Sequence, residues 1–254
     1  MEARHNYRVV RISSLALLVL SWELIARSVS SMFVPSFLDV AAAFVQIVST
    51  RDFWDAIWVS HQAFVLGFGC AVIVGTLLGL AMGRWRAVES LCDPYLNLLL
   101  ATPISAAIPV IILAVGLGLP ARTLVVFLFS LAVIVVNTRA GLKTIEPSWI
   151  EMAHGFGATE LQLWRTVLIP GALPSMMAGY YLGLGRALNG MIAVELLLVA
   201  VGIGRVILDY QGMFAADKLY ATVTFVALES VLLLSAVRWI ERRITPWAEQ
   251  VAVG

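Results

Sequence analysis

The sequence predicts an all-α, polytopic membrane protein with about six transmembrane helices. Of its 254 residues, 61% are hydrophobic and only 13% are charged, and the mean hydropathy is +0.92. Because a water-soluble domain has about a quarter of its residues charged, much of the outer surface of this chain must face lipid. The formal net charge of +1 gives no reason to expect nucleic acid as a partner.

Apolar runs that can cross a bilayer, which takes about 20 residues in a helix, occur six times. The predicted spans are residues 9–26, 56–82, 91–117 and 122–137, a helix within 174–201, and residues 219–239. The first span also has the features of a signal peptide, and we expect it to be retained as an anchor. Residues 1–55 are therefore predicted to form an anchor helix with an external interfacial segment, residues 56–242 a transmembrane core, and residues 243–254 a cytoplasmic tail.

Basic residues predict the orientation, because cytoplasmic connections carry an excess of Lys and Arg. With the N-terminus inside, eleven basic residues lie on the inner side: Arg4, Arg8, Arg11, Arg84, Arg86, Arg139, Lys143, Arg165, Arg238, Arg242 and Arg243. Five lie on the outer side: Arg27, Arg51, Arg122, Arg205 and Lys218. Both termini are therefore predicted to lie in the cytoplasm.

Small residues at every fourth position predict where helices pack closely in lipid. One stripe lies on the second predicted span and another on the fifth: Ala71, Gly75, Gly79 and Gly83, and Gly179, Gly183 and Ala187. We expect these positions to pack helices rather than to carry chemistry.

The connection between the fourth and fifth spans is predicted to contain two short helices at an angle. Pro147 opens the first helix, Gly155 and Gly157 end it, Thr159 caps the second, and Pro170 stops it. One apolar face of the second helix is expected from Leu161, Trp164 and Leu168.

This connection carries a recognisable pattern. Permeases of ABC importers have a loop that begins Glu-Ala-Ala and continues with a glycine and, about nine residues later, Ile-x-Leu-Pro. The chain has Glu151-Met152-Ala153, Gly157 and Val167-Leu168-Ile169-Pro170, in the same place among its spans. The sequence thus resembles the permease subunits of binding-protein-dependent ABC importers.

Residues from about 58 to 234 are similar to the nitrate, sulfonate and taurine branch of that family. The segments that carry this similarity are Leu66-Gly67-Phe68, Gly79-Leu80-Ala81-Met82-Gly83, Asp93-Pro94, Leu184-Gly185-Arg186-Ala187 and Gly202-Ile203-Gly204. One departure concerns the third span, where the branch usually has two adjacent prolines. This chain has Thr102-Pro103-Ile104-Ser105 instead, so its pathway lining is expected to differ.

The resemblance implies several partners. They are two cytoplasmic ATPase subunits, a periplasmic or extracellular substrate-binding protein, and a second permease copy that forms a homodimer in a bacterial-type cytoplasmic (inner) membrane. It also implies that the loop docks on the ATPase through Glu151, Met152, Ala153, His154, Gly157 and Ala158. The chain itself is not expected to be an enzyme, because neither Lys143 nor Lys218 follows a phosphate-binding glycine loop. We expect it to bind no cofactor or metal, with ATP and Mg on the partner ATPase.

Polar residues within the spans are costly and suggest function. Arg186, Asn189 and Glu195 lie in the fifth span, and Thr102 and Ser105 in the third; all five are predicted to line the translocation path. Arg186 would offset the charge of an anionic substrate. The alternative is that Arg186 and Glu195 pair with other helices or with a second protomer.

The resemblance implies a small anionic solute such as nitrate, a sulfonate or taurine. A heterocycle resembling a thiamine precursor is the alternative. An ion-coupled secondary transporter would need intramembrane carboxylates or two corresponding halves with broken helices, and the sequence shows no convincing repeat. An intramembrane enzyme would need a nucleophile with its base, or metal ligands, at membrane depth. The sequence indicates neither.

Overall fold

The chain is built from helices in the computed structural model, which describes residues 2–29, 33–197 and 200–247 and has no strand in those residues. In chain order the helices are α1 (Glu2–Val29), α2 (Phe37–Val48), α3 (Arg51–Arg84), α4 (Arg86–Ala101), α5 (Ile104–Val115), α6 (Leu119–Lys143), α7 (Pro147–Gly155), α8 (Glu160–Leu163), the π-helical turn η1 (Trp164–Leu168), α9 (Ile169–Leu197), α10 (Gly202–Gly212) and α11 (Ala216–Ile244). The predicted all-α fold is confirmed.

Four helical runs among the described residues are long and apolar enough to cross a membrane: Arg51–Arg84, Leu119–Lys143, Glu160–Leu197 and Ala216–Ile244. They correspond to the second, fourth, fifth and sixth predicted spans. The first predicted span, 9–26, lies within α1, where several side chains are outside the described residues. The count of six spans therefore stays a prediction.

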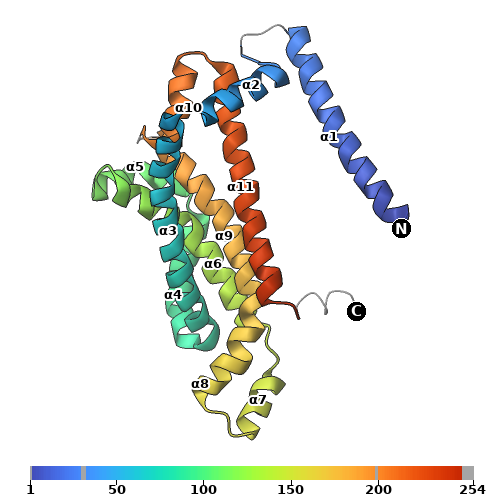
Figure 1. The fold of residues 1–254 in the computed structure, drawn as a ribbon. Helices are drawn as coiled ribbons and strands as arrows, with labels where there is room; N and C mark the ends of the chain where they lie inside the picture. Colours follow the sequence, from blue (N-terminus) through green and yellow to red (C-terminus); the bar gives the residue numbers. More distant parts are fainter. Residues whose placement is uncertain (1, 30–32, 198–199, 248–254) are drawn as a thin grey trace.

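The third predicted span, 91–117, is wrong as one continuous helix. α4 and α5 are bent by 106° relative to each other, and α5 points sideways from the bundle (Figure 1). The break lies at Thr102, whose φ of −77° and ψ of 127° are extended. Because a residue before proline is disfavoured in the α conformation, Pro103 accounts for the break.

Three long helices form the centre of the bundle, with α6 packed against both α3 and α9 (Figure 1). A Cβ atom added at Gly79 of α3 would lie 2.6 Å from Thr138 Cβ, and one added at Gly183 of α9 would lie 2.8 Å from Ile134 Cγ1. Both distances are too short for two carbon atoms, so only glycine allows this approach. The two predicted stripes of small residues are confirmed as packing surfaces.

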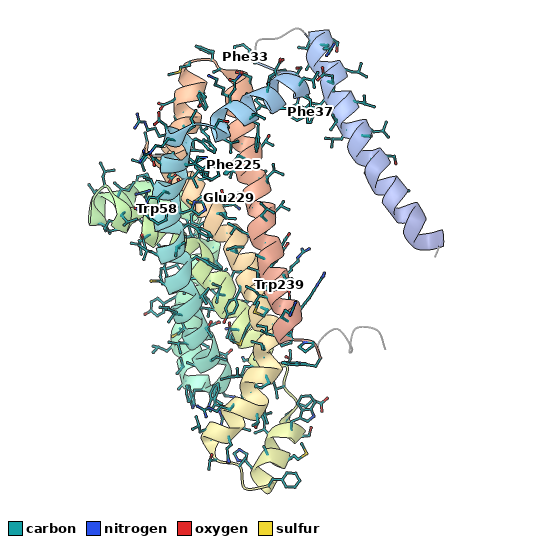
Figure 2. All side chains as sticks on the ribbon, in the orientation of Figure 1. Phe33, Phe37, Trp58, Phe225, Glu229 and Trp239 are labelled. Carbon is teal, nitrogen blue, oxygen red and sulfur yellow. The ribbon has the colours of Figure 1, made fainter. Side chains whose placement is uncertain are left out.

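The bundle has two ends, which we call the α10 end and the α7 end (Figure 1). α1 is held at the α10 end, where the Trp22 indole N–H donates to the Pro35 carbonyl at 3.2 Å and the Phe37 amide donates to Glu23 at 2.9 Å. The rest of α1 stands away from the bundle. α2 packs on α11 and corresponds to the predicted interfacial element. Phe33 and Phe37 lie near this end, whereas Trp239 lies toward the other (Figure 2).

Ion pairs join helices at the α7 end. On α6, Arg139 pairs with Asp93 of α4 and Lys143 pairs with Glu89 of α4. These contacts hold the first half of the broken span against the central helix.

Candidate functional site

The two-helix connection between α6 and α9 projects beyond the α7 end of the bundle (Figure 1). Pro147 occupies the first turn of α7, which ends at Gly155. Gly157 has a φ of +75°, a left-handed conformation that glycine adopts without strain, and it turns the chain toward α8. Thr159 then caps α8 in a capping box with Gln162. The predicted boundaries of this bend are confirmed.

α7 has an inner and an outer apolar face. Ile150 and Ala153 pack on a buried cluster beneath the helix, made by Leu142, Ile145, Leu163, Leu168, Ala172 and Met176. On the outer side, Trp149, Met152 and Phe156 are exposed, Phe156 by 87%. Such an apolar patch on a segment outside the bundle is typical of a protein interaction surface.

The residues predicted to dock an ATPase lie on or beside this outer surface. Glu151, Met152, His154 and Gly157 are exposed, and Ala153 and Ala158 are half-buried. Sequence reasoning missed Trp149 and Phe156. The spacing of Trp149, Met152 and Phe156, at i, i+3 and i+7, could have revealed this second apolar face.

The second helix of the connection differs from prediction in its apolar face. Leu161 is 62% exposed, whereas Leu163 is fully buried and Leu168 is 1% exposed. The reason is that the helix packs inward through Leu163, Leu168 and the partly buried Trp164, so Leu161 falls on the opposite side.

Pro170 does not stop this helix, contrary to prediction. The run continues from Glu160 to Leu197 because η1 changes the hydrogen-bond pattern just before the proline. There, the Ile169 amide bonds to the Trp164 carbonyl, five residues earlier. A π-helical turn of this kind accommodates a residue that has no N–H of its own. A continuous helical connection therefore runs from the bend into the bundle.

Glu195, predicted to line the path, is instead fully buried. Its carboxylate accepts hydrogen bonds from the Ser60 hydroxyl at 2.8 Å and the Gly204 amide at 3.1 Å, and Arg122 lies 3.4 Å away. These contacts match the alternative given in the sequence analysis, in which Glu195 pairs with residues of other helices. We refer to Ser60, Arg122 and Glu195 as the buried ionic junction; it joins α3, α6 and α9 and holds the start of α10.

A second interhelical pair, between two half-buried side chains, was not predicted. His61 of α3 lies 2.7 Å from Glu229 of α11, and its other ring nitrogen lies 2.8 Å from the Ile57 carbonyl. Glu229 and Phe225 project from α11 in the half of the bundle near the α10 end (Figure 2). One imidazole nitrogen thus faces the Glu229 carboxylate, and the other faces the Ile57 carbonyl. The pair ties α11 to the central helices.

Arg186 of α9 is exposed on the surface of the protomer, although it lies within a run that can cross a membrane. A cavity of about 340 Å³ brings it together with Thr102 and Ser105 of the α4–α5 break. A neighbouring cavity of about 270 Å³ is lined by Arg186 and Asn189. An arginine at the bilayer centre costs about 3 kcal/mol or more if it faces lipid. We therefore expect the surface around Arg186 to contact water or another protein.

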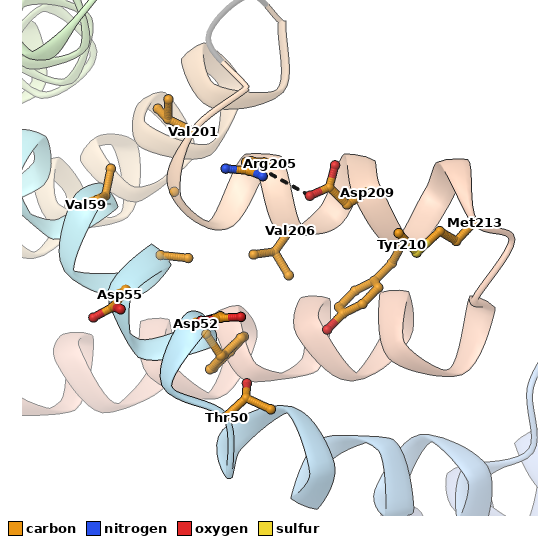
Figure 3. Close-up of a pocket in the computed structure, with 13 residues that line it drawn as sticks. Thr50, Asp52, Asp55, Val59, Val201, Arg205, Val206, Asp209, Tyr210 and Met213 are labelled. Carbon is orange, nitrogen blue, oxygen red and sulfur yellow. Dashed lines mark hydrogen bonds and ion pairs between the residues drawn. The ribbon is translucent and has the colours of Figure 1, made fainter.

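A larger cavity of about 600 Å³ lies at the α10 end, between the start of α3 and α10 (Figure 3). Asp52, Asp55 and Tyr210 line it, together with Arg205 and Asp209, which form an ion pair at 3.3 Å. Across the described residues, no group of three or more His, Cys, Asp or Glu side chains could hold a metal ion.

Comparison with known proteins relates this architecture to transporters. The taurine transport system permease protein of Escherichia coli (strain K12) is 29% identical over 247 residues, covering 94% of this chain and 90% of the relative. A putative aliphatic sulfonates transport permease protein of the same strain is 30% identical over 235 residues, covering 91% and 88%. The riboflavin transport system permease protein of Chloroflexus aurantiacus (strain ATCC 29366 / DSM 635 / J-10-fl) is 30% identical over 236 residues, covering 92% and 88%.

A solved structure has the same fold. A chain of the MetNI methionine ABC transporter, in an inward-facing conformation, superposes with a TM-score of 0.58 at 22% identity, covering 77% of this chain and 95% of that chain. Residues 67–246 match the model of the family described as binding-protein-dependent transport system inner membrane component. The chain therefore belongs to this family, as a permease subunit of an ABC importer.

Proposed function

We propose that this permease forms the membrane path for a small anionic solute, and that a separate ATPase docked on α7 drives its opening and closing. The observation that carries the proposal is the outer face of α7. Trp149, Met152 and Phe156 project outside the bundle, with Glu151 beside them. The continuous helix from Glu160 to Leu197 would transmit movement of the loop into the bundle, whereas a floppy loop would absorb it.

The excess of basic residues on the α7 side supports an orientation in which α7 and both termini lie in the cytoplasm. The α10 end then faces outward, where a separate binding protein would deliver solute. In this arrangement residues 1–55 are the anchor and interfacial segment, residues 56–242 the permease core and residues 243–254 the tail. Two ATPase subunits, each with bound ATP and Mg, would serve two permease copies.

A homodimer is part of the proposal because one protomer leaves Arg186 exposed on its outer surface. A second copy would enclose the space in front of Arg186 and keep its charge away from lipid, where it is costly. Arg186, Asn189, Thr102 and Ser105 would then line the path. Glu195 is excluded from this set because it is fully buried.

The names of two relatives, for taurine and for aliphatic sulfonates, support an anionic solute, and an arginine in the path fits that charge. The riboflavin permease supports a second candidate, a heterocyclic solute. Identifying the ligand that copurifies with the cognate binding protein separates the two. A sulfonate, nitrate or similar anion supports the first candidate, and a neutral heterocycle supports the second.

The proposal is tested by purifying the permease from its native membrane and reconstituting it with the proteins that copurify. We expect an ATPase to copurify and solute uptake into proteoliposomes to require ATP. Uptake that continues after ATP has been removed, with no ATPase attached, would contradict the proposal.

A further inference from the structure

Arg186 carries a positive charge within a helical run that can cross a membrane. Within the described residues its guanidinium has no hydrogen-bond or ion-pair partner, unlike Arg122, which is paired with Glu195, and Arg139, which is paired with Asp93. A cation at membrane depth with no carboxylate beside it can stabilise an anion that arrives from outside the protein.

The cavity beside Arg186 contains no other charged residue. Its remaining lining is apolar or neutral and includes Thr102 and Ser105. No counter-charge lines this space of about 340 Å³, so its single positive charge attracts anions.

Neutral donors lie opposite the charge, at the α4–α5 break. The Ser105 hydroxyl has no hydrogen-bond partner in the described part of the chain, whereas the Thr102 hydroxyl already donates to the Leu98 carbonyl at 2.7 Å. α5 begins at Ile104, so its first-turn amides and the positive end of its helix dipole lie in the same wall. Arg186 and Ser105 therefore face one space from two different helices.

We propose that this cavity is the subsite for the anionic group of the transported solute, with Arg186 supplying the charge and Ser105 and the first turn of α5 supplying neutral donors. This inference rests on the proposed function and adds to it the residues that recognise the anionic group. The bend at Thr102 and Pro103 creates the N-terminus of α5 beside this cavity. A continuous helix would have no free amides there.

The test measures the local potential at position 105 and needs no knowledge of the solute. Cys70 and Cys92, the free cysteines of the described residues, are replaced by alanine, and Ser105→Cys is introduced. Membranes that contain the full importer are freeze-thawed so that reagents reach both faces. The rates of modification by an anionic sulfonatoethyl and a cationic trimethylammonioethyl methanethiosulfonate are then compared, each relative to its rate with free cysteine.

We expect the anionic reagent to be favoured, and Arg186→Gln to lower the anionic-to-cationic rate ratio by about tenfold or more. Arg186→Lys should retain most of the preference. Arg238→Gln is the matched control, since Arg238 lies on α11 and contacts Tyr181; it should leave the ratio unchanged. Gel filtration of each variant establishes that the compared proteins are folded.

The inference is overturned if Ser105→Cys reacts with neither reagent, because the cavity would then be closed to water. It is equally overturned if the ratio is the same with Arg186 and with Arg186→Gln, because the arginine would then be neutralised by a partner. Neither outcome depends on ATP-driven uptake. A failure of the proposed function would appear separately, as a wild-type importer whose uptake does not require ATP.

Discussion

The Ser60 hydroxyl on α3 donates a 2.8 Å hydrogen bond to the Glu195 carboxylate on α9, at a position where neither residue has any solvent contact. The same hydroxyl accepts a hydrogen bond from the Ile203 amide at 2.9 Å, and Arg122 of α6 lies within 3.4 Å of the carboxylate. Four helices thus meet at one buried ionic junction, which holds the α10 end of the bundle together.

Removing the carboxylate should destabilise the fold strongly. Glu195→Ala leaves Arg122 buried without a counter-charge, and breaking a buried pair in this way costs about 3–5 kcal/mol. The measurement is the unfolding temperature in detergent. Glu160→Ala is the control, because Glu160 is exposed and pairs with Arg84 at 3.4 Å; we expect a loss of at most about 1 kcal/mol. Equal losses in the two variants would show that the junction contributes little.

The turn into α10 should tolerate no side chain at Gly202. Its φ is +61°, and a Cβ atom there would lie 2.2 Å from the Ser60 hydroxyl oxygen. Gly202→Ala would therefore displace Ser60 from Glu195 and cost about 1–3 kcal/mol. Gly212→Ala, at the end of the same helix and with no atom within 4 Å of the added Cβ, should be close to neutral. The same unfolding assay checks both variants. An unchanged unfolding temperature for Gly202→Ala would contradict the close approach of Gly202 to Ser60.

Close packing of α3 on α6 leads to a third prediction. A methyl group at Gly79 would lie 2.6 Å from Thr138 Cβ and 2.9 Å from the Val135 carbonyl oxygen, whereas one at Gly69 meets no atom within 4 Å. Gly79→Ala should therefore lower stability by about 1–3 kcal/mol, and Gly69→Ala should have little effect. Similar unfolding temperatures for these two substitutions on the same helix would mean that the helices can separate without cost.

The bend of the two-helix connection should be required for coupling. Gly157 has a φ of +75°, a conformation that costs other residues about 1–2 kcal/mol, so Gly157→Leu should displace α7. Glu151→Ala removes the charge beside the outer face. In both variants we expect inserted protein and ATP hydrolysis but little import, measured together in proteoliposomes. Gly155→Leu is the control, since no atom lies within 4 Å of an added Cβ at Gly155. Normal import in both test variants would contradict the docking role.

The sequence was most informative where structure is set by neighbouring residues. Pro147, Gly157 and Thr159 specify the bend locally, and hydrophobic composition together with stripes such as Gly75 and Gly79 specifies close-packed helices in lipid. Glu195 could not be placed in the same way, because its partners Ser60 and Arg122 lie 135 and 73 residues away in the chain. Hydropathy ranks residues by polarity and carries no information on which helix will supply a counter-charge.

Proline residues alone did not predict where helices end. Pro103 breaks the third span because Thr102 before it is extended, yet Pro94 and Pro174 lie inside helices and η1 carries the helix past Pro170. Whether a helix survives a proline depends on whether the released carbonyl finds another partner, which is decided by packing. The sequence predicted that Arg186 and Ser105 line one path. The cavity that joins them lies at the break beside Pro103, which a single helix over residues 91–117 does not contain.

The most direct test of the central claim places a photoreactive benzoylphenylalanine at Phe156, the 87%-exposed aromatic side chain directly after α7, in the importer purified with its partners. Leu113 of α5, 89% exposed and away from α7, is the control position. We predict that irradiation links position 156, and not position 113, to the ATPase, and that the linked complex no longer imports solute. No link from position 156, or full import by the linked complex, would contradict the account.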